Sequence, residues 1–416
     1  MVISSLLDTD LYKLTMQACI LKHFKDADVE YLLHNRSNAV LSLEAIEWVK
    51  NEIKSWSNLR LTDDELAFLK QHLPFLCDEY FEFAKNLRIN PEKEVEITVE
   101  NPESEKPELK VTVRGKWQNV MWYEVPLLAV ISEAYFKFVE NDWNMEGQYE
   151  RAKQKAEELI ANDCPFSEFG SRRRRSHETH EVIIKAIIDG AKGSPLFVGT
   201  SNVAMAKKFN LKPIGTVAHE LVMGIAAYTD DYINANQRTM ELWIDTVGPE
   251  HAGVALTDTF GTGLFLRDFK PPFSDIYTGV RHDSGDPEEF TKIIAQHYKK
   301  LGYKPFSKKL VYSDSLTVKK CLRFKKYAID NELVPSFGIG TFFTNDFYHT
   351  SRPEVKSAPL NIVMKLDTVN GQHVVKLSDN KGKHTGDEAE IERCKRIVDY
   401  VYSSEPIDEA NRWTSF

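Results

Sequence analysis

The sequence predicts an α/β fold in which a barrel of parallel strands carries an active site, with a smaller α+β part formed by the ends of the chain. Seven short apolar runs rich in strand-forming residues occur between Phe166 and Phe337, and most are separated by stretches of helical length and pattern. Strands that alternate with helices form parallel βα units. Polar, reactive side chains follow nearly every run, and in such units these side chains meet on one face. The pattern is therefore typical of an enzyme.

Length and composition fit this prediction and argue against other classes of protein. The chain has 416 residues, so a barrel of roughly 200 to 250 residues leaves room for a smaller domain. The net charge of −9 argues against a general nucleic-acid-binding surface, which is usually basic. The longest purely apolar run near the middle, Val125 to Ile131, is far shorter than a membrane span. We therefore expect neither nucleic acid nor a membrane as a partner.

Cysteine usage and the N-terminal residues bear on the cellular compartment. The five cysteines are scattered and include no CxxC pair, which indicates reduced thiols and neither a disulfide framework nor a zinc site. The first residues, MVISSLLDTDLYKL, lack the basic region and the long apolar stretch of a signal peptide. We expect a cytoplasmic protein, and the sequence leaves a nuclear pool open.

Residues 1–125 do not show the alternation of strands and helices, and they are predicted to form an α+β domain. The residues Thr62 to Glu65 (TDDE) form a capping-box sequence ahead of one helical stretch. A polar segment containing proline, Asn101 to Leu109, indicates a hairpin loop between two strands. We expect helices over 10–25, 43–56 and 62–72, an extended segment over 29–34, and a long apolar helix over 125–139 that leads into the barrel.

Residues 126–345 are predicted to form the catalytic barrel. Amphipathic stretches over 179–191, 232–246 and 287–299 supply helices between the strands. The seven apolar runs, each with the polar residues that follow it, are FSEFGSRRRRS, PLFVGTSN, PIGTVAHE, GVALTDTFGTG, IYTGVRHDSGDP, KLVYSDS and PSFGIGT.

Residues 346–416 are predicted to pack back on the N-terminal domain and make it discontinuous. The βα rhythm stops after Thr341. Asn370-Gly371 lies between alternating apolar residues, which is a strong signal for a β-hairpin. The segment 387–403 has the pattern of a terminal helix.

Four consecutive arginines follow the first run, beginning at Arg172. Most basic runs are solvated helix faces, but this one begins directly after a predicted strand and Gly170. The guanidinium group binds two oxygens of a carboxylate or phosphate at once. Because successive residues of a helix point in different directions, at most one or two of the four can face a pocket. Arg172, nearest the strand end, is the candidate.

The second and third runs offer a polar loop and a histidine. Gly199 to Asn202 (GTSN) has the composition of a helix cap, or of a site where free backbone N–H groups bind an anionic or polar ligand. His219 lies in GTVAHE, where a histidine can act as a nucleophile or a general base. Most single histidines are structural. A functional role for His219 is favoured only because it belongs to the ordered series of apolar runs that are followed by polar residues.

The fourth and fifth runs place carboxylates at neighbouring strand ends. Asp258 lies in LTDT and Asp283 in RHDSGDP. Two converging carboxylates suit Mg²⁺, which takes oxygen ligands and keeps waters and substrate phosphates in its shell. Asp286 is also explained as the cap of the helix that begins at Pro287. Arg281 and Asp283 are two residues apart and point to the same side of an extended segment.

The last two runs complete the series with Asp314 in YSDS and the GxGT sequence of Gly338, Gly340 and Thr341. Glycines let backbone amides approach a phosphate closely, and the late loops of barrels often bind phosphate. The chain has no Walker-type or GxGxxG sequence, so ordinary kinase and dinucleotide sites are unsupported.

Together with LLDTDLYKLTM near the N-terminus, this ordered set resembles the nicotinate phosphoribosyltransferase family, from Leu6 to about Asp379. The resemblance implies a two-domain protein with an irregular seven-stranded α/β barrel. It also implies the reaction: nicotinate and phosphoribosyl pyrophosphate give nicotinate mononucleotide and pyrophosphate, coupled to ATP hydrolysis and assisted by Mg²⁺. In NAD salvage this is the step that uses nicotinic acid.

The resemblance also implies roles for single residues. His219 matches the histidine that ATP phosphorylates, and Tyr12 is typically delivered by a neighbouring subunit, which makes a homodimer the expected assembly. The catalytic set is His219, Asp283 and Asp314, and Mg²⁺ lies near Asp258 and Asp283. The nicotinate-binding positions are Tyr12, Phe169, Arg172, Ser201, Thr216 and Arg281. The 5′-phosphate is held by Gly338, Gly340 and Thr341.

The sequence also leaves other functions open. Nicotinamide phosphoribosyltransferase has the same type of barrel but typically carries an aspartate at the position of Ser201, and an aspartate would repel a carboxylate substrate. Quinolinate phosphoribosyltransferase does not use the phosphorylated histidine. A barrel that senses a metabolite without catalysis, or a nucleic-acid contact through the arginines, are alternatives from other classes.

Overall fold

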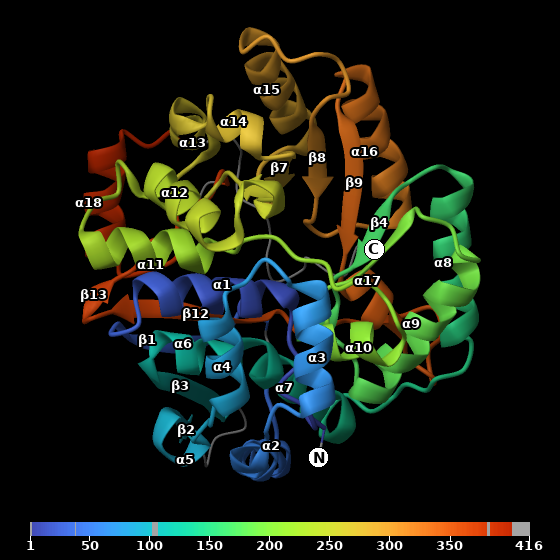
Figure 1. Ribbon diagram of the computed structural model, residues 1–416. Helices are drawn as coiled ribbons and strands as arrows, with labels where there is room; N and C mark the ends of the chain where they lie inside the picture. Colours follow the sequence, from blue (N-terminus) through green and yellow to red (C-terminus); the bar gives the residue numbers. More distant parts are fainter. Residues whose placement is uncertain (1, 38, 102–106, 381–382, 402–416) are drawn as a thin grey trace.

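The computed structural model describes residues 2–37, 39–101, 107–380 and 383–401. Its architecture is a mixed α/β fold with two principal sheets (Figure 1). One is a parallel sheet of six strands, and the other is an antiparallel sheet of five strands.

The parallel sheet is built from six of the seven apolar runs. Its strand order is β5-β4-β9-β8-β7-β6. Each carboxyl end leads into one of the polar sequences described above, so these sequences lie along one edge. The strands are β4 (Phe166–Glu168), β5 (Phe197–Thr200), β6 (Val254–Leu256), β7 (Gly279–His282), β8 (Lys309–Tyr312) and β9 (Val334–Ile339).

The third run does not form a strand, and the seven-stranded barrel is therefore not confirmed. Pro213 makes a single parallel bridge with Thr200, and the N–H of Ile214 donates to the Thr200 carbonyl at 2.8 Å. Proline lacks the N–H that a ladder needs, so pairing does not extend through it. The chain then passes close to the N-terminal segment, where a Cβ added to Gly215 would lie 3.0 Å from the backbone nitrogen of Tyr12.

Helices connect the strands of the parallel sheet, as the amphipathic pattern predicts. The predicted helices over 179–191, 232–246 and 287–299 correspond to α9, α12 and α15. The connecting helices are α9 (His177–Ala191), α10 (Val203–Lys208), α11 (His219–Thr229), α12 (Ala235–Val247), α13 (Thr262–Asp268), α14 (Phe273–Ile276), α15 (Pro287–Lys300) and α16 (Val318–Asp330).

The antiparallel sheet joins the two ends of the chain. Its order is β13-β12-β1-β3-β2, so β1 from the N-terminal region lies between β12 from the C-terminal region and β3. The hairpin predicted at Asn370-Gly371 is present, with Val369 paired to Gln372. The strands are β1 (Asp28–Asn35), β2 (Val95–Glu100), β3 (Glu108–Lys116), β12 (Ile362–Val369) and β13 (Gln372–His373).

The N-terminal helices attach this sheet to the parallel one. In Figure 1 helix α1 (Leu11–His23), in blue, lies between the antiparallel sheet and the upper part of the molecule. The N–H of Leu11 donates to the Ser201 carbonyl at 2.8 Å, which ties the start of α1 to the end of β5. The predicted capping box of α3 is present at Thr62 and Glu65. The other N-terminal helices are α2 (Leu43–Ser55), α3 (Asp63–His72), α4 (Asp78–Asn86), α5 (Pro91–Glu94), α6 (Trp117–Val120) and α7 (Glu124–Phe138).

The C-terminal tail ends in helix α18 (Glu388–Val398). The predicted helix over 387–403 extends beyond it, and residues 402 and 403 lie outside the described residues. The five cysteines are free thiols, and all but Cys77 are buried.

Among the residues that the structure describes, no helix has both the length and the apolar character needed to cross a membrane.

Candidate active site

A pocket with a volume of about 300 Å³ opens where the carboxyl ends of the parallel strands meet helix α1 and strand β12. Most of the site residues predicted from the sequence share this one cavity, although they come from distant parts of the chain. Those that line it are Tyr12, Phe169, Arg172, Ser201, Thr216, His219, Arg281, Asp283, Asp314, Gly340 and Thr341.

Asp258 and Gly338 lie just behind the pocket wall. Asp258 is buried, and its Oδ1 atom lies 3.4 Å from Nε2 of His219. Gly338 packs under an aromatic ring, because a Cβ added there would lie 2.5 Å from two ring carbons of Phe169. Gly338 therefore allows the Phe169 ring to take its place in the pocket, and Gly340 and Thr341 are the members of the GxGT sequence that reach the cavity.

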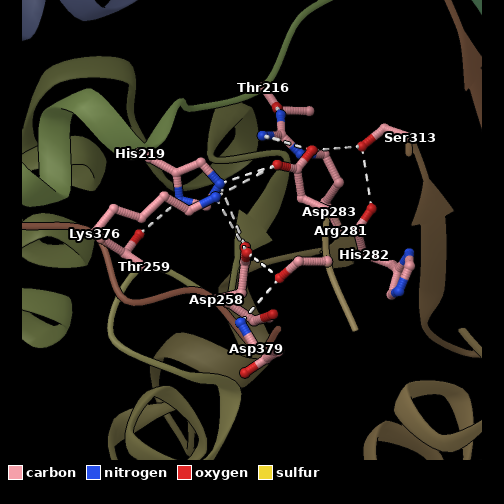
Figure 2. A network of polar contacts seen from close by, with 12 residues as sticks. Thr216, His219, Asp258, Thr259, Arg281, His282, Asp283, Ser313, Lys376 and Asp379 are labelled. Carbon is pink, nitrogen blue, oxygen red and sulfur yellow. Dashed lines mark hydrogen bonds and ion pairs between the residues drawn. The ribbon is translucent and has the colours of Figure 1, made fainter. Parts of the chain in front are cut away.

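His219 is the first residue of α11 and sits among hydroxyl and carboxylate groups (Figure 2). Its Nδ1 lies 3.0 Å from Oγ1 of Thr259, and its Nε2 lies 3.1 Å from Oδ2 of Asp283. Because Nε2 faces carboxylates, which only accept, the neutral ring carries its proton there, and Nδ1 accepts from the threonine hydroxyl. Burial and the nearby Lys376 lower the pKa of His219, so the ring is neutral at neutral pH.

The two aspartates beside His219 are ionised despite their burial. Burial alone would raise the pKa of Asp258, but the charge of Lys376 and the neighbouring His219 ring bring it down to about 2. Burial opposes the ionisation of Asp283 in the same way, and the hydrogen bond from His219 and the charge of Arg281 hold its pKa well below the usual range. Asp283 also accepts from Oγ of Ser313 at 3.1 Å.

Lys376 is a site residue that the sequence did not reveal. It follows β13 in the C-terminal tail, and its Nζ lies 3.4 Å from Asp258 and 3.9 Å from Asp283 (Figure 2). Its neighbours in the sequence, VVKLSD, form no recognisable motif, and it is far in the chain from the aspartates. The pairing of β12 with β1 brings the tail toward the pocket, and the N–H of Leu377 holds it there by donating to the carbonyl of Thr259 at 2.8 Å.

The residues around His219 fit a divalent cation. Atoms of His219, Asp258 and Asp283 lie within 4.8 Å of one another, and the two ionised carboxylates supply the oxygens that a cation binds. Oδ1 of Asp258 is buried and accepts no hydrogen bond from the described residues, so a lone pair is left for a ligand. Mg²⁺ prefers such carboxylate oxygens and completes its shell with water and phosphate.

The other end of the pocket is aromatic and basic. The Tyr12 hydroxyl donates to Oε2 of Glu124 at 3.3 Å, and Nη1 of Arg172 lies 3.5 Å from Oε1 of the same glutamate. Arg281 donates through Nη1 to the hydroxyl of Thr216 and, at 3.2 Å, to the carbonyl of Val217. The guanidinium groups of Arg172 and Arg281 therefore share a cavity with the rings of Tyr12 and Phe169, an arrangement suited to a flat anionic ligand.

Asp10 is a second residue that sequence reasoning missed. Its Oδ1 accepts from the hydroxyls of Ser171 and Ser201, at 2.6 and 2.7 Å. Burial raises the pKa of Asp10, which favours its neutral form. The absence of an aspartate at position 201 thus does not keep carboxyl groups out of this region, because Asp10 lies beside Ser201.

Several basic side chains around the pocket were also not predicted as site residues. They come from the loop after β1, from the arginine run, and from the C-terminal tail. They are Arg36, Arg173, Lys365, Lys376 and Lys383. Such a concentration of positive charge suits a ligand that carries several phosphates.

Comparison with known proteins agrees with this geometry. The model of the nicotinate phosphoribosyltransferase (NAPRTase) family matches residues 164–401, and that of its N-terminal domain matches residues 7–132. The chain is 48% identical to a nicotinate phosphoribosyltransferase of Saccharomyces cerevisiae over 99% of both chains. A solved structure from the same yeast has a TM-score of 0.94 at 48% identity, covering 96% of this chain and 99% of that one.

A nicotinate phosphoribosyltransferase from Porphyromonas gingivalis has a solved structure with a TM-score of 0.89 at 35% identity. It covers 96% of this chain and 100% of the other. Since the two family models together match most of the residues and the relatives match end to end, this chain belongs to the nicotinate phosphoribosyltransferase family.

Proposed function

We propose that this protein transfers the phosphoribosyl group of phosphoribosyl pyrophosphate to nicotinate, giving nicotinate mononucleotide and pyrophosphate in NAD salvage. The observation that carries the proposal is the composition of one pocket. Its aromatic and arginine end suits a pyridine carboxylate, its histidine and aspartate cluster suits metal and phosphate chemistry, and basic side chains lie around both.

The base is held by the aromatic and basic end of the pocket. Tyr12 and Phe169 bind the faces of the pyridine ring, while Arg172 and Arg281 bind its carboxylate. Ser201 and Thr216 complete the set with hydroxyl groups. All six side chains line the cavity, which supports this assignment.

The phosphoribosyl donor occupies the rest of the pocket. Gly340 and Thr341 bind the 5′-phosphate, with Gly338 keeping Phe169 in position, and Asp314 lies beside the ribose. The pyridine nitrogen attacks the anomeric carbon with its lone pair, and the bond from that carbon to the pyrophosphate oxygen breaks. When bound by Asp258 and Asp283, Mg²⁺ offsets the charge that develops on the leaving pyrophosphate.

ATP phosphorylates His219 in this proposal. Asp283 accepts a hydrogen bond from the Nε2–H of His219 and so fixes the tautomer in which Nδ1 carries the lone pair. The Thr259 hydroxyl must first turn away from Nδ1. The Nδ1 atom then forms a bond to the γ-phosphorus of ATP, and the bond from that phosphorus to ADP breaks. Water later cleaves the phosphohistidine to phosphate. If the phosphorylated and unphosphorylated enzymes differ by a few kcal/mol in the free energy of substrate binding, substrate affinity changes about a hundredfold between them.

We further propose the division into an N-terminal domain (1–125), a barrel domain (126–345) and a C-terminal part (346–416). The pocket takes residues from all three, since Tyr12, His219 and Lys376 face the same cavity. Tyr12 lines the pocket of its own chain, so this residue gives no reason to invoke a second subunit, and the homodimer stays a prediction. A cytoplasmic location, with a nuclear pool left open, is supported by the free thiols.

The decisive experiment offers the protein phosphoribosyl pyrophosphate and Mg²⁺ with either nicotinate or nicotinamide, each with and without ATP. We expect mononucleotide from nicotinate, with stimulation by ATP. Product from nicotinamide would instead assign the amide reaction and make Ser201 a misleading guide. No product from either base would overturn the enzymatic proposal and favour a sensor.

A further inference from the structure

Lys13 is a buried cation that the reaction outlined above does not use. Its ammonium group is paired with two carboxylates, at 2.5 Å from Oε2 of Glu124 and in contact with Oε2 of Glu220. Its side chain is only 1% exposed. Burial alone would lower the pKa of Lys13, but the charges of Glu124 and Glu220 raise it, so the group is a permanent cation.

Both carboxylates that Lys13 binds line the nicotinate end of the pocket. Glu124 contacts Tyr12 and Arg172 through the bonds already described. Glu220 follows His219 at the start of α11, and its other oxygen accepts from Tyr31 at 2.5 Å and from Trp117 at 3.1 Å. Lys13 itself lies behind the wall, because it is absent from the residues that line the cavity.

The pairing of Lys13 with Glu124 and Glu220 determines the net formal charge next to the position proposed for nicotinate. Lys13, Glu124 and Glu220 together carry one negative charge, and without the lysine they would carry two. Glu124 competes with a ligand carboxylate for Arg172, since its Oε1 lies 3.5 Å from that guanidinium. Charges in a partly buried site act strongly on one another, so the uncompensated glutamates would repel an anionic base.

We propose that Lys13 is a specificity-determining residue that neutralises Glu124 and Glu220, so that the pocket accepts the carboxylate of its base. It acts through these glutamates and touches no substrate. The inference rests on the proposed use of nicotinate.

The test compares Lys13→Met with the double variant Lys13→Met/Glu124→Gln. The single variant leaves the triad with two negative charges, and the double variant restores one. We expect the nicotinate KM to rise on the order of tenfold to a hundredfold in the single variant, the scale of a unit charge acting across a partly buried pocket. The double variant recovers most of that affinity, while the KM for phosphoribosyl pyrophosphate changes little in either.

Lys22→Met is the matched control, because Lys22 lies on the same helix, is 42% exposed and pairs with Asp245 away from the pocket. A merely structural role for Lys13 predicts that kcat falls with both KM values raised, and that the double variant is no better than the single one. Either an unchanged nicotinate KM in Lys13→Met or the absence of recovery in the double variant overturns the inference.

Two further results keep the test decisive. If Lys13→Met does not fold, the double variant alone decides, because it carries the wild-type charge without the lysine, and a nicotinate KM still raised more than about tenfold would refute the charge argument. If the wild-type protein makes no nicotinate mononucleotide, the proposed function fails. If the wild type is active and the nicotinate KM of Lys13→Met is unchanged, only the proposed role of Lys13 is refuted.

Discussion

The Nε2 atom of His219 lies 3.1 Å from Oδ2 of Asp283, a contact that joins the first residue of α11 to the residue after β7. The carboxylate fixes the ring tautomer and leaves Nδ1 toward the hydroxyl of Thr259. The lowered pKa of His219 keeps this nitrogen unprotonated at neutral pH. A buried histidine with one nitrogen oriented and the other able to attack is suited to covalent phosphorylation.

His219→Ala tests this role. We expect the variant to lose all stimulation by ATP and all labelling by γ-phosphate-labelled ATP, while it retains slow, ATP-independent transfer to nicotinate. The reason is that the pyridine nitrogen is itself the nucleophile of the transfer step. His251→Ala, at an exposed ring stacked on Phe75, serves as the control. Unchanged ATP stimulation in His219→Ala would contradict the assignment.

Arg281→Ala is expected to raise the nicotinate KM on the order of a hundredfold, since truncating one partner of a buried charge pair costs about 2–5 kcal/mol. Arg281 also holds the hydroxyl of Thr216 and the carbonyl of Val217, so the pocket residue Thr216 loses its anchor as well. Steady-state kinetics with nicotinate as the varied substrate provide the measurement. Arg267→Ala removes an arginine that is 46% exposed and lies outside the pocket lining, and it should leave this KM unaltered.

The Gly338→Ala variant tests whether Gly338 makes room for the Phe169 ring or helps to bind the 5′-phosphate. The new methyl group would lie 2.5 Å from the Phe169 ring and displace it. Overpacking of this kind costs about 1–3 kcal/mol, so we expect the nicotinate KM to rise about tenfold. A rise confined to the KM for phosphoribosyl pyrophosphate would show instead that Gly338 serves the 5′-phosphate. Gly263→Ala is the control, because a Cβ at Gly263 would meet nothing within 4 Å.

Asp379 makes the stability of the protein depend on pH. Burial and the charge of Asp258 raise its pKa from 3.8 to about 6. The folded state therefore binds the proton more tightly than the unfolded chain, and stability falls as the pH rises from about 4 to about 6. The full difference corresponds to roughly 3 kcal/mol at about 1.4 kcal/mol per pKa unit.

The Asp379→Asn variant should lack this contribution of Asp379 to the pH dependence of stability. We expect the variant to match the wild type below about pH 4 and to gain relative stability up to about pH 6 in denaturant unfolding, because an amide does not ionise. Asp330→Asn, at a residue 54% exposed, controls for the loss of an acid. A stability difference between Asp379→Asn and the wild type that does not vary over this range would mean that the carboxyl group stays ionised throughout.

The strand ends were the most predictable part of the site. Arg172, Asp283 and Asp314 could be named from the sequence because each follows an apolar run that forms a strand, and parallel strands bring their carboxyl ends to one edge. His219 reaches the same pocket from the start of α11, after a run that forms no strand. The same reasoning failed for the third run. Its apolar letters resemble a strand, but the backbone of Pro213 cannot extend the ladder, and a close approach to Tyr12 takes the chain elsewhere.

Residues whose roles depend on contacts with distant parts of the chain could not be predicted from the sequence. Lys376, Asp10 and Lys13 acquire their roles from partners that are distant in the chain, and no local pattern marks such contacts. The arginine run was only partly understood. Arg174 is fully buried and forms a bidentate pair with Asp8, and Arg175 stacks on Phe136 at 3.6 Å. Arg174 thus holds the N-terminal segment to the first strand end, Arg175 packs in the interior, and neither of the two is solvated surface.

The position of β12 beside β1 has a consequence for synthesis on the ribosome. Met364, Lys365 and Leu366 on this strand and Lys376 beyond it help to line the pocket, so the cavity is incomplete until these residues have emerged. A nascent chain that ends before β12 leaves one edge of β1 without its native neighbour. The protein therefore acquires its full site only after β12 and the residues that follow it have been made, and a stop codon before β12 removes this pocket wall along with the tail.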